Sequence, residues 1–470
     1  MRRRRRWGLI VLGILAVLIL VPTGWMIYSY FSTQNAWDDA AAEAAQDLPR
    51  WRLLELEADR PQIPDHENSA LQIIAAHSKG GRLQVGGAPN YDLIFEKLPP
   101  TTQLNTQQLE LIHGELGKVG PGLPLARSLK DMPRGRFPIK YSDDGISTLL
   151  PNHQDARTVA DWLKHDAYAL AQDEKYEDAA DSCRAILNAG RSMEGDLTLI
   201  CHLIRIAMQM IATDALERVL AQGTLKEEAL QSLQATLERD GKQDHWIAAI
   251  RGERALMNHL FENVRSGKVK MSALGGMGRG GAASLQDWLF DTFPSTMLKY
   301  YPEHLRYMNA AVEIARLPIH ERGPKLQEQE AQLKNTNILT RLLAPALTKV
   351  HNAEARSQAM LRSAAVALAC ERYRQRHKDW PASLDGLVQV KLLDAVPLDP
   401  FDGQPLRYRR TKDGIVIYSV GPDKIDNQGH IDRERSHEPG VDVGFRLWNP
   451  GARRQEPRPA VGLPEVGGPE

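Results

Sequence analysis

The chain lacks the residue patterns that mark several large classes of proteins. Three cysteines among 470 residues are too few for a disulfide framework. Lysine plus arginine equals aspartate plus glutamate, 59 of each, so no excess of positive charge indicates nucleic-acid binding. No Gly-x-Ser-x-Gly, His-Glu-x-x-His, Cys-x-x-Cys or Walker motif occurs. We therefore do not expect a nucleophile-elbow serine hydrolase, a zincin metalloprotease or a P-loop NTPase.

The three cysteines, Cys183, Cys201 and Cys370, all fall in segments with helical patterns. Cys183 and Cys201 can meet across a helical hairpin and pair in an oxidising compartment. The simpler interpretation is that they are small buried residues within helices.

An apolar run near the start is the most prominent feature of the chain. Residues 7–35 contain no Asp, Glu, Lys, Arg or His. About 20 apolar residues cross a hydrocarbon core, so the run is long enough to span a bilayer even if the helix frays after Pro22. Trp7 at one end, and Trp25 and Tyr28 at the other, match the aromatic belts of membrane interfaces.

Charge at the ends of this run predicts its orientation. Residues 2–6 are all arginine, and such clusters stay in the cytoplasm. We predict a single-pass protein of the cytoplasmic (inner) membrane, with its N-terminus inside and residues 36 onward outside. A cleaved signal peptide is the alternative, but Pro22-Thr23-Gly24-Trp25 forms no small-x-small cleavage site.

Helical patterns dominate the middle of the chain. We expect a mixed region over 36–150, with a short helix just outside the membrane and another capped by Asp65 or Asn68. A helical domain follows over 151–346, with helices at 197–221, 226–239 and 244–265 and a glycine-rich connector at 275–281. Two predicted helices carry residues that resemble one tetratricopeptide-type hairpin: Ala167, Leu170, Tyr176, Ala179, Cys183 and Ile186. The pattern does not recur 34 residues later, so a general helical bundle is the alternative.

Several polar residues of the helical segments are candidates for chemistry. Cys201 and His202 are adjacent, so on a helix they point about 100° apart and cannot form a nucleophile–base pair. His351 and Glu354 share a helical face, and we interpret them as a solvent-facing pair rather than as metal ligands. Arg251, Glu253 and Arg254 read as a charged helix face.

The end of the chain predicts a small module of helix and sheet over 347–448. A helix over 347–377 ends before Trp380-Pro381. Two strands follow, joined at Asp413-Gly414 by a tight turn that needs positive φ, with Ile415 and Ile417 on one face. The last segment, 449–470, is rich in Gly and Pro, and we expect it to be disordered.

Three segments of this module carry a resemblance to a known family. In order, they are ALACERYRQRHKDWPASLDGLV, VPLDPFDGQPLRYRR and GIVIYSVGPDKIDNQG. Over roughly 90 of the 470 residues the chain resembles the globular part of the major pseudopilin of type II secretion systems. The front segment RWRLLELEADRPQIPDHENSA is similar to large membrane-anchored proteins of unknown function from planctomycete-type bacteria.

The pseudopilin resemblance implies a helical spine with a sheet packed on it, placement outside the cytoplasm and a calcium-binding loop. The loop corresponds to residues 421–432, and the matching acids are Asp423, Asp426 and Asp432. Hard oxygen ligands in a flexible loop suit calcium, although EF-hand spacing is absent; a solvated polar loop is the alternative. Pseudopilins carry a glutamate within the apolar helix, and this chain has none in residues 7–35.

Together these features predict a mainly α protein: one transmembrane helix within 1–35, a helical body and a small α+β module. The expected role is non-enzymatic, in contacts with envelope proteins, with links to secretion or envelope assembly and no nucleic acid. An exported, membrane-anchored hydrolase with converging carboxylates in the helical domain is the alternative. A sensor of soluble ligands has the least support, because six residues cannot form a cytoplasmic signalling domain.

Overall fold

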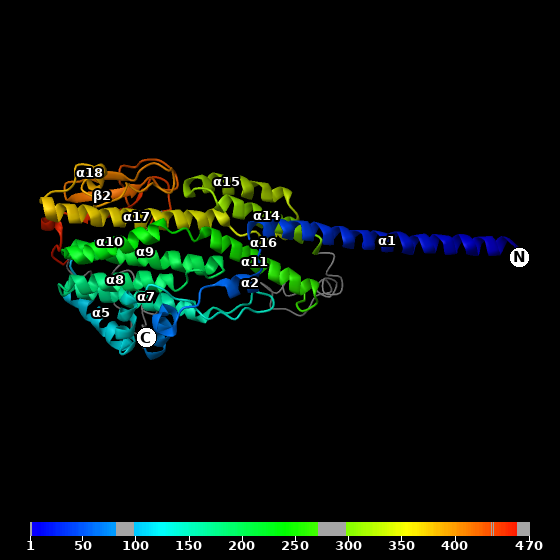
Figure 1. Ribbon diagram of the computed structural model, residues 1–470, viewed down its shortest axis with the longest axis horizontal. Helices are drawn as coiled ribbons and strands as arrows, with labels where there is room; N and C mark the ends of the chain where they lie inside the picture. Colours follow the sequence, from blue (N-terminus) through cyan, green and yellow to red (C-terminus); the bar gives the residue numbers. More distant parts are fainter. Residues whose placement is uncertain (1, 81–97, 271–297, 434, 436, 458–470) are drawn as a thin grey trace, which may run out of the picture.

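The computed structural model describes residues 2–80, 98–270 and 298–457, apart from 434 and 436. The protein is mainly helical, with a small antiparallel sheet near the C-terminus (Figure 1). The helices are α1 (Arg2–Asp47), α2 (Leu53–Asp59), α3 (Ser69–Lys79), α5 (Thr106–Val119), α6 (Gly122–Arg127), α7 (Pro151–Gln172), α8 (Tyr176–Arg191), α9 (Leu199–Gln222), α10 (Glu227–Lys242), α11 (Trp246–Arg265), α14 (Tyr301–Ala315), α15 (Ile319–Gln332), α16 (Ile338–Leu343), α17 (Leu347–His377) and α18 (Leu384–Gln389). The strands are β1 (Arg407–Arg410), β2 (Gly414–Ser419) and β3 (Val443–Trp448).

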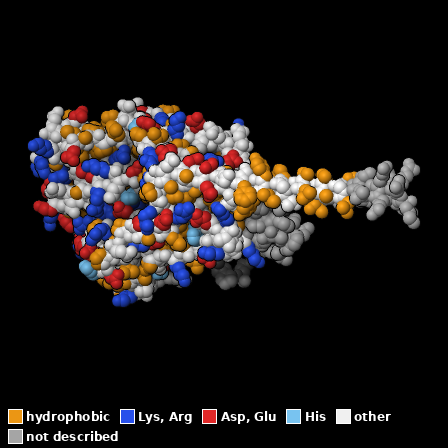
Figure 2. Space-filling view, turned by 45° about the vertical axis from the view of Figure 1, so that its right-hand side comes forward, with side chains coloured by type: hydrophobic (Ala, Val, Ile, Leu, Met, Phe, Trp, Pro, Cys, Tyr) orange, Lys and Arg blue, Asp and Glu red, His pale blue; other side chains and the backbone are white. Residues whose placement is uncertain are grey.

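Helix α1 is a single helix of 46 residues, about 69 Å long, that projects from the body (Figure 1). α1 therefore continues through Pro22 and into the segment after residue 36, so the prediction of a separate short helix in that segment is wrong. Extending an existing helix costs little, and the Ala-rich segment after Trp37 continues it without a break. Along the stalk, apolar side chains such as Leu18 and Leu20 are exposed (Figure 2).

The last turns of α1 are part of the core of the body. Trp37, Ala40 and Ala44 are buried and pack in one cluster with Phe261 of α11 and Tyr301 of α14. The rings of Trp37 and Tyr301 lie 4.7 Å apart between centroids. The projecting helix and the body are thus joined by packing, without an intervening linker.

A buried carboxylate completes this junction. Asp47 Oδ2 accepts hydrogen bonds from Arg251 Nε at 3.0 Å and Arg254 Nη2 at 2.9 Å. Its other oxygen pairs with Arg316, the residue that follows α14. The predicted charged helix face is therefore wrong for Arg254, which is 1% exposed because it neutralises Asp47.

The helical body is a bundle in which α7, α8 and α9 all contact one another. Ala167, Ala179, Cys183 and Ile186 are buried between them, as the hairpin pattern predicted. Besides α1, helix α9 also meets the length and composition of a membrane span, but 61% of its apolar window is buried inside the protein. Helix α9 is a core helix of the bundle.

Helix α17 has the bounds expected from the sequence and holds the bundle and sheet together. It contacts α9 and α10 on one side and β2 and β3 on the other. The helix is also a core element of the body, because residues 355–372 are almost all buried. Small residues such as Ala359, Ser363 and Ala367 let neighbours approach α17 from every side.

The sheet has the order β1-β2-β3, all antiparallel. Ile415 and Ile417 face the core as predicted, together with Phe445 and Leu447 of β3, a strand the sequence patterns did not indicate. Gly414 does not have the positive φ expected for a tight turn. A Cβ on Gly414 would lie 1.9 Å from the Leu447 carbonyl oxygen, so glycine is needed there for close approach of two strands.

Contacts also connect segments on both sides of positions 150 and 346. One apolar cluster includes Ala70, Val159 and Leu361, so it packs residues from before 150, from 151–346 and from beyond 346 together. Disorder from residue 449 is wrong for the described residues up to 457, because the buried Arg453 donates to Glu371 Oε2 at 2.8 Å and Gln455 N donates to Thr101 O at 2.7 Å. The predicted connector at 275–281 lies outside the described residues.

Replacing Asp47 should loosen the junction between α1 and the body. Asp47→Ala leaves three arginines without their carboxylate, and we expect the free energy of unfolding to fall by about 3 kcal/mol. Denaturant unfolding of the detergent-solubilised protein measures this. The matched control is Asp39→Ala, an exposed acid of the same helix, which should change stability by less than about 0.5 kcal/mol. Equal effects of the two substitutions would contradict the role of Asp47.

Candidate functional site

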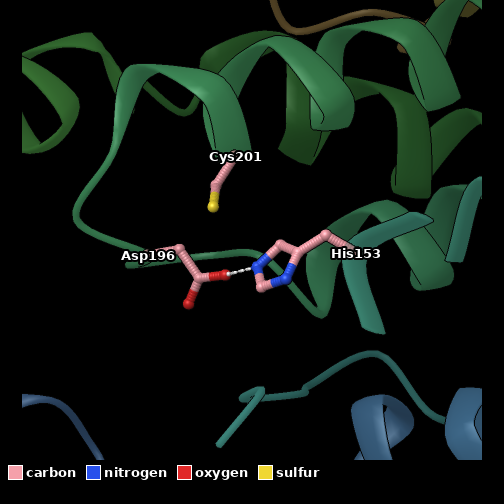
Figure 3. Close-up of side chains that lie close together, drawn as sticks. All are labelled: His153, Asp196 and Cys201. Atoms are coloured by element: carbon pink, nitrogen blue, oxygen red, sulfur yellow. Dashed lines mark hydrogen bonds and ion pairs between the residues drawn. The ribbon is translucent and has the colours of Figure 1, made fainter. Parts of the chain in front are cut away.

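One group of three metal-ligating side chains lies close together among the described residues: His153, Asp196 and Cys201 (Figure 3). His153 is in the first turn of α7, Asp196 is in the loop before α9, and Cys201 is in the first turn of α9. One ligand atom from each lies within 4.8 Å of the others, and all three residues are buried. No sequence motif indicated this group, because 43 residues separate His153 from Asp196.

Hydrogen bonds connect this cluster to the front of the chain. His153 Nε2 and Asp196 Oδ2 are 2.7 Å apart, and the other Asp196 oxygen pairs with Arg60 at the end of α2. Arg60 also donates to Glu57, which in turn accepts from Arg136 Nη2 at 2.6 Å. Two arginines and two carboxylates of this network pair with one another, so their charges balance. The arrangement links three segments that are distant in sequence.

Cys201 is not set up as a nucleophile. Burial, with the carboxylate of Asp196 nearby, raises the pKa of the Cys201 thiol to about 12. The thiol is therefore protonated at neutral pH, whereas the thiolate is the reactive form. Thr198, the N-cap of α9, hydrogen-bonds the sulfur at 2.9 Å and accepts from Cys201 N, which fixes the side chain in place.

The three donors are of types that zinc accepts, but their geometry is that of a hydrogen-bonded ion pair. Zinc bonds of about 2.1 Å in a tetrahedron hold ligand atoms about 3.4 Å apart. His153 Nε2 and Asp196 Oδ2 are closer than that, and both carboxylate oxygens already have partners. Bound zinc would also lie beside the Arg60 cation. The cluster therefore fits a structural role better than that of a metal centre.

A second buried polar group corrects the expectation of a solvent-facing pair on α17. His351 and Glu354 are 3% and 4% exposed, and Glu354 Oε2 lies 2.9 Å from His202 Nε2 of α9. Burial opposes the charge on Glu354, but His202 and Arg205 hold its pKa down at about 2. Cys201 and His202 do point apart as expected, one into each cluster.

The neighbouring histidines of this second group are neutral. Burial, with Arg322 nearby, lowers the pKa of His351 to about 4. Burial and the Arg205 cation lower the pKa of His245 to about 3. These groups make a pH-sensitive contact between α9, the start of α11 and α17.

The three aspartates predicted for calcium do not form a compact ligand group among the described residues. Asp423 accepts from Gly440 N at 2.8 Å, and Asp426 accepts from the Tyr418 hydroxyl at 3.1 Å. Asp432 pairs with Arg435 in the same loop. Calcium binding at Asp423, Asp426 and Asp432 remains a prediction.

The cysteines are free, and all three are buried. The simpler interpretation of Cys183 and Cys201, as small residues inside helices, is confirmed. Cys183 packs in the core of α7 and α8, while Cys201 belongs to the polar cluster.

The fold places the protein in a broad structural class: it is mainly helical, with an apolar N-terminal helix and a small C-terminal antiparallel sheet. Comparison with protein-family models, with curated proteins and with solved structures found no match. The pseudopilin resemblance therefore remains a prediction from the sequence.

Removing Asp196 should destabilise the protein far more than removing Cys201. Asp196→Ala leaves buried Arg60 with Glu57 as its remaining carboxylate and removes the partner of His153, with an expected loss of about 3–5 kcal/mol. Cys201→Ala should cost about 1–2 kcal/mol. Denaturant unfolding with added zinc and with a chelator distinguishes a structural role of this cluster from a zinc site. A stabilisation by zinc that Cys201→Ala abolishes would contradict the structural role.

Acidification should weaken the folded state through His351. The unfolded chain takes up a proton at this residue near pH 6.5, whereas the folded protein does so only near pH 4. The free energy of unfolding therefore falls as the pH decreases across that interval. His351→Gln should reduce this fall by the order of 3 kcal/mol in urea unfolding at several pH values. The exposed His66, changed to Gln, is the control and should leave the pH dependence unchanged.

Proposed function

We propose that this chain is a non-enzymatic scaffold of the cell envelope, anchored in the cytoplasmic membrane by α1. Its helical body and pseudopilin-like module lie outside the cytoplasm and contact other envelope proteins. The arginines at residues 2–6 support this orientation.

The continuity of α1 carries the proposal. A stalk with exposed apolar side chains runs into turns that are buried in the body, without a joint between them. Within the part of the chain that the structure describes, stalk side chains such as Leu18 and Leu20 are exposed, and a bilayer would bury them. A helix fixed at its base then holds the body at a constant distance from the membrane.

The exposed residues beyond Gly24 favour a retained anchor over a cleaved signal. Trp25, Ile27 and Phe31 are 64%, 54% and 61% exposed. Cleavage near Gly24 would leave this apolar surface in water, which soluble proteins rarely tolerate.

The polar clusters of the described residues support a scaffold rather than the hydrolase alternative. Asp196 and Glu354 are each paired with a histidine and buried. A groove lined by Glu57 and Arg136 lies at the far end of the Asp196 network, but neither Asp196 nor Glu354 lines it. Catalytic carboxylates need access to substrate and to water. Because Asp196 and Glu354 are paired and buried, they instead connect segments of the helical body.

Cysteine labelling tests the topology. Lys412→Cys places one exposed thiol in the loop before β2, while the native thiols are buried. A membrane-impermeant maleimide should label it in intact spheroplasts as fully as after detergent lysis. Labelling only after lysis would overturn the proposed orientation. The mass of the purified protein should equal that of the full chain, and a mass that lacks the first 22–30 residues would instead identify a cleaved signal.

A further inference from the structure

The sheet has a second face, opposite the core, and the register aligns two arginines across it. Arg409 of β1 pairs with Val416 of β2, and Val416 pairs with Arg446 of β3. Adjacent strands lie about 4.8 Å apart, so the two arginine backbones are about 10 Å apart on either side of Val416. Both side chains are long enough to reach one group placed above Val416.

This face is hollowed into a groove of about 310 Å³. Thr411 and Trp448 line one end of it, and residues 427–430 line the other. The groove is large enough for a few residues of an extended peptide.

The loop that forms one wall is held rigidly. Asp442, which is fully buried, accepts from Gly429 N at 2.7 Å and from Asn427 N at 3.2 Å. Gly429 has φ of +76°, and a Cβ there would lie 2.7 Å from Val416 Cγ1. The wall therefore rests directly on the sheet, and the groove exists before any ligand arrives.

Two arginines and one acid line the groove, and the Glu217 carboxylate accepts from Arg446 N at 2.7 Å beside it, so the lining keeps a modest excess of positive charge. Within the described part of the chain, the exposed Arg446 side chain makes no hydrogen bond or ion pair, and Arg409 donates only to Gln428 O, at 2.6 Å. Asp413 is the one acid of the lining, and it accepts from Thr411 Oγ1 at 2.9 Å. Glu217, behind β3, already pairs with Arg433.

We infer that this groove binds an acidic peptide segment of a partner protein. Its carboxylates would meet the forked guanidinium donors of Arg409 and Arg446, and its backbone would lie against Trp448 and the groove wall at 427–430. The sheet lies at the end of the body away from the projecting part of α1, so headgroups of the protein's own membrane are out of reach (Figure 1). This assignment rests on the proposed function and gives the partner's chemistry.

Binding of a labelled peptide tests the inference on the detergent-solubilised full chain. The probe is an eight-residue peptide of alternating Glu and Gly, and the same peptide with Lys in place of Glu is the control ligand. Fluorescence anisotropy should show binding of the Glu peptide alone, weakening as salt is raised. Arg446→Gln and Arg409→Gln should each weaken binding by about tenfold or more.

Arg410→Gln is the matched control variant. It removes the same charge from the same strand, but Arg410 pairs with Asp379 on the opposite face. Binding should change by less than about twofold. Equal losses in Arg410→Gln and Arg446→Gln would show a general charge effect and overturn the site.

Charge reversal keeps the test decisive. The double variant Arg409→Glu, Arg446→Glu should lose the Glu peptide and gain the Lys peptide, with a thermal unfolding midpoint close to that of the parent. Complete competition by inorganic phosphate at low millimolar concentration would identify a phosphate site and overturn the peptide assignment. Topology labelling is independent of this assay. Absence of peptide binding would therefore leave the proposed membrane-anchored scaffold unaffected, and a failed topology test would not change the peptide-binding result.

Discussion

The carboxylate of Asp47 lies where α1, whose projecting part is apolar and exposed, becomes part of the helical body. Three arginines surround it, and the aromatic ring of Trp37 packs three turns earlier on the same helix. An unpaired charge buried at this position would cost several kcal/mol, so these partners hold α1 in one direction relative to the bundle. The position of the body relative to the exposed apolar part of α1 depends on this rigid connection.

Buried pairs of opposite charge recur through the rest of the structure. Arg60 with Asp196, His202 with Glu354, and Arg453 with Glu371 each join segments that are distant in sequence. Desolvation offsets much of the attraction in such pairs, so they stabilise less than their number suggests, but each strongly disfavours any packing that separates its members. The same pairing occupies these carboxylates and histidines with one another.

The sheet module is integrated with the helical body. Helix α17 presents small residues to the bundle on one side and to β2 and β3 on the other, and Arg453 returns beyond β3 to reach Glu371 in α17. One face of the sheet is therefore buried against the core. The opposite face carries Arg409, Arg446 and the groove, and the proposed peptide site lies there.

Local patterns were enough to predict much of the architecture. The apolar run, the bounds of α17, the Asn68 cap of α3 and the inward face of β2 follow from hydropathy, periodicity and capping, because each depends on residues close together in the chain. Other features depend on contacts between distant segments. These are the continuous α1, strand β3, the apolar cluster that spans positions 150 and 346, and the order of residues 449–457. For the same reason His351 and Glu354 read as a surface pair, and the grouping of His153, Asp196 and Cys201 went unseen. A charged side chain looks solvent-exposed in a sequence until folding supplies the opposite charge that lets it be buried.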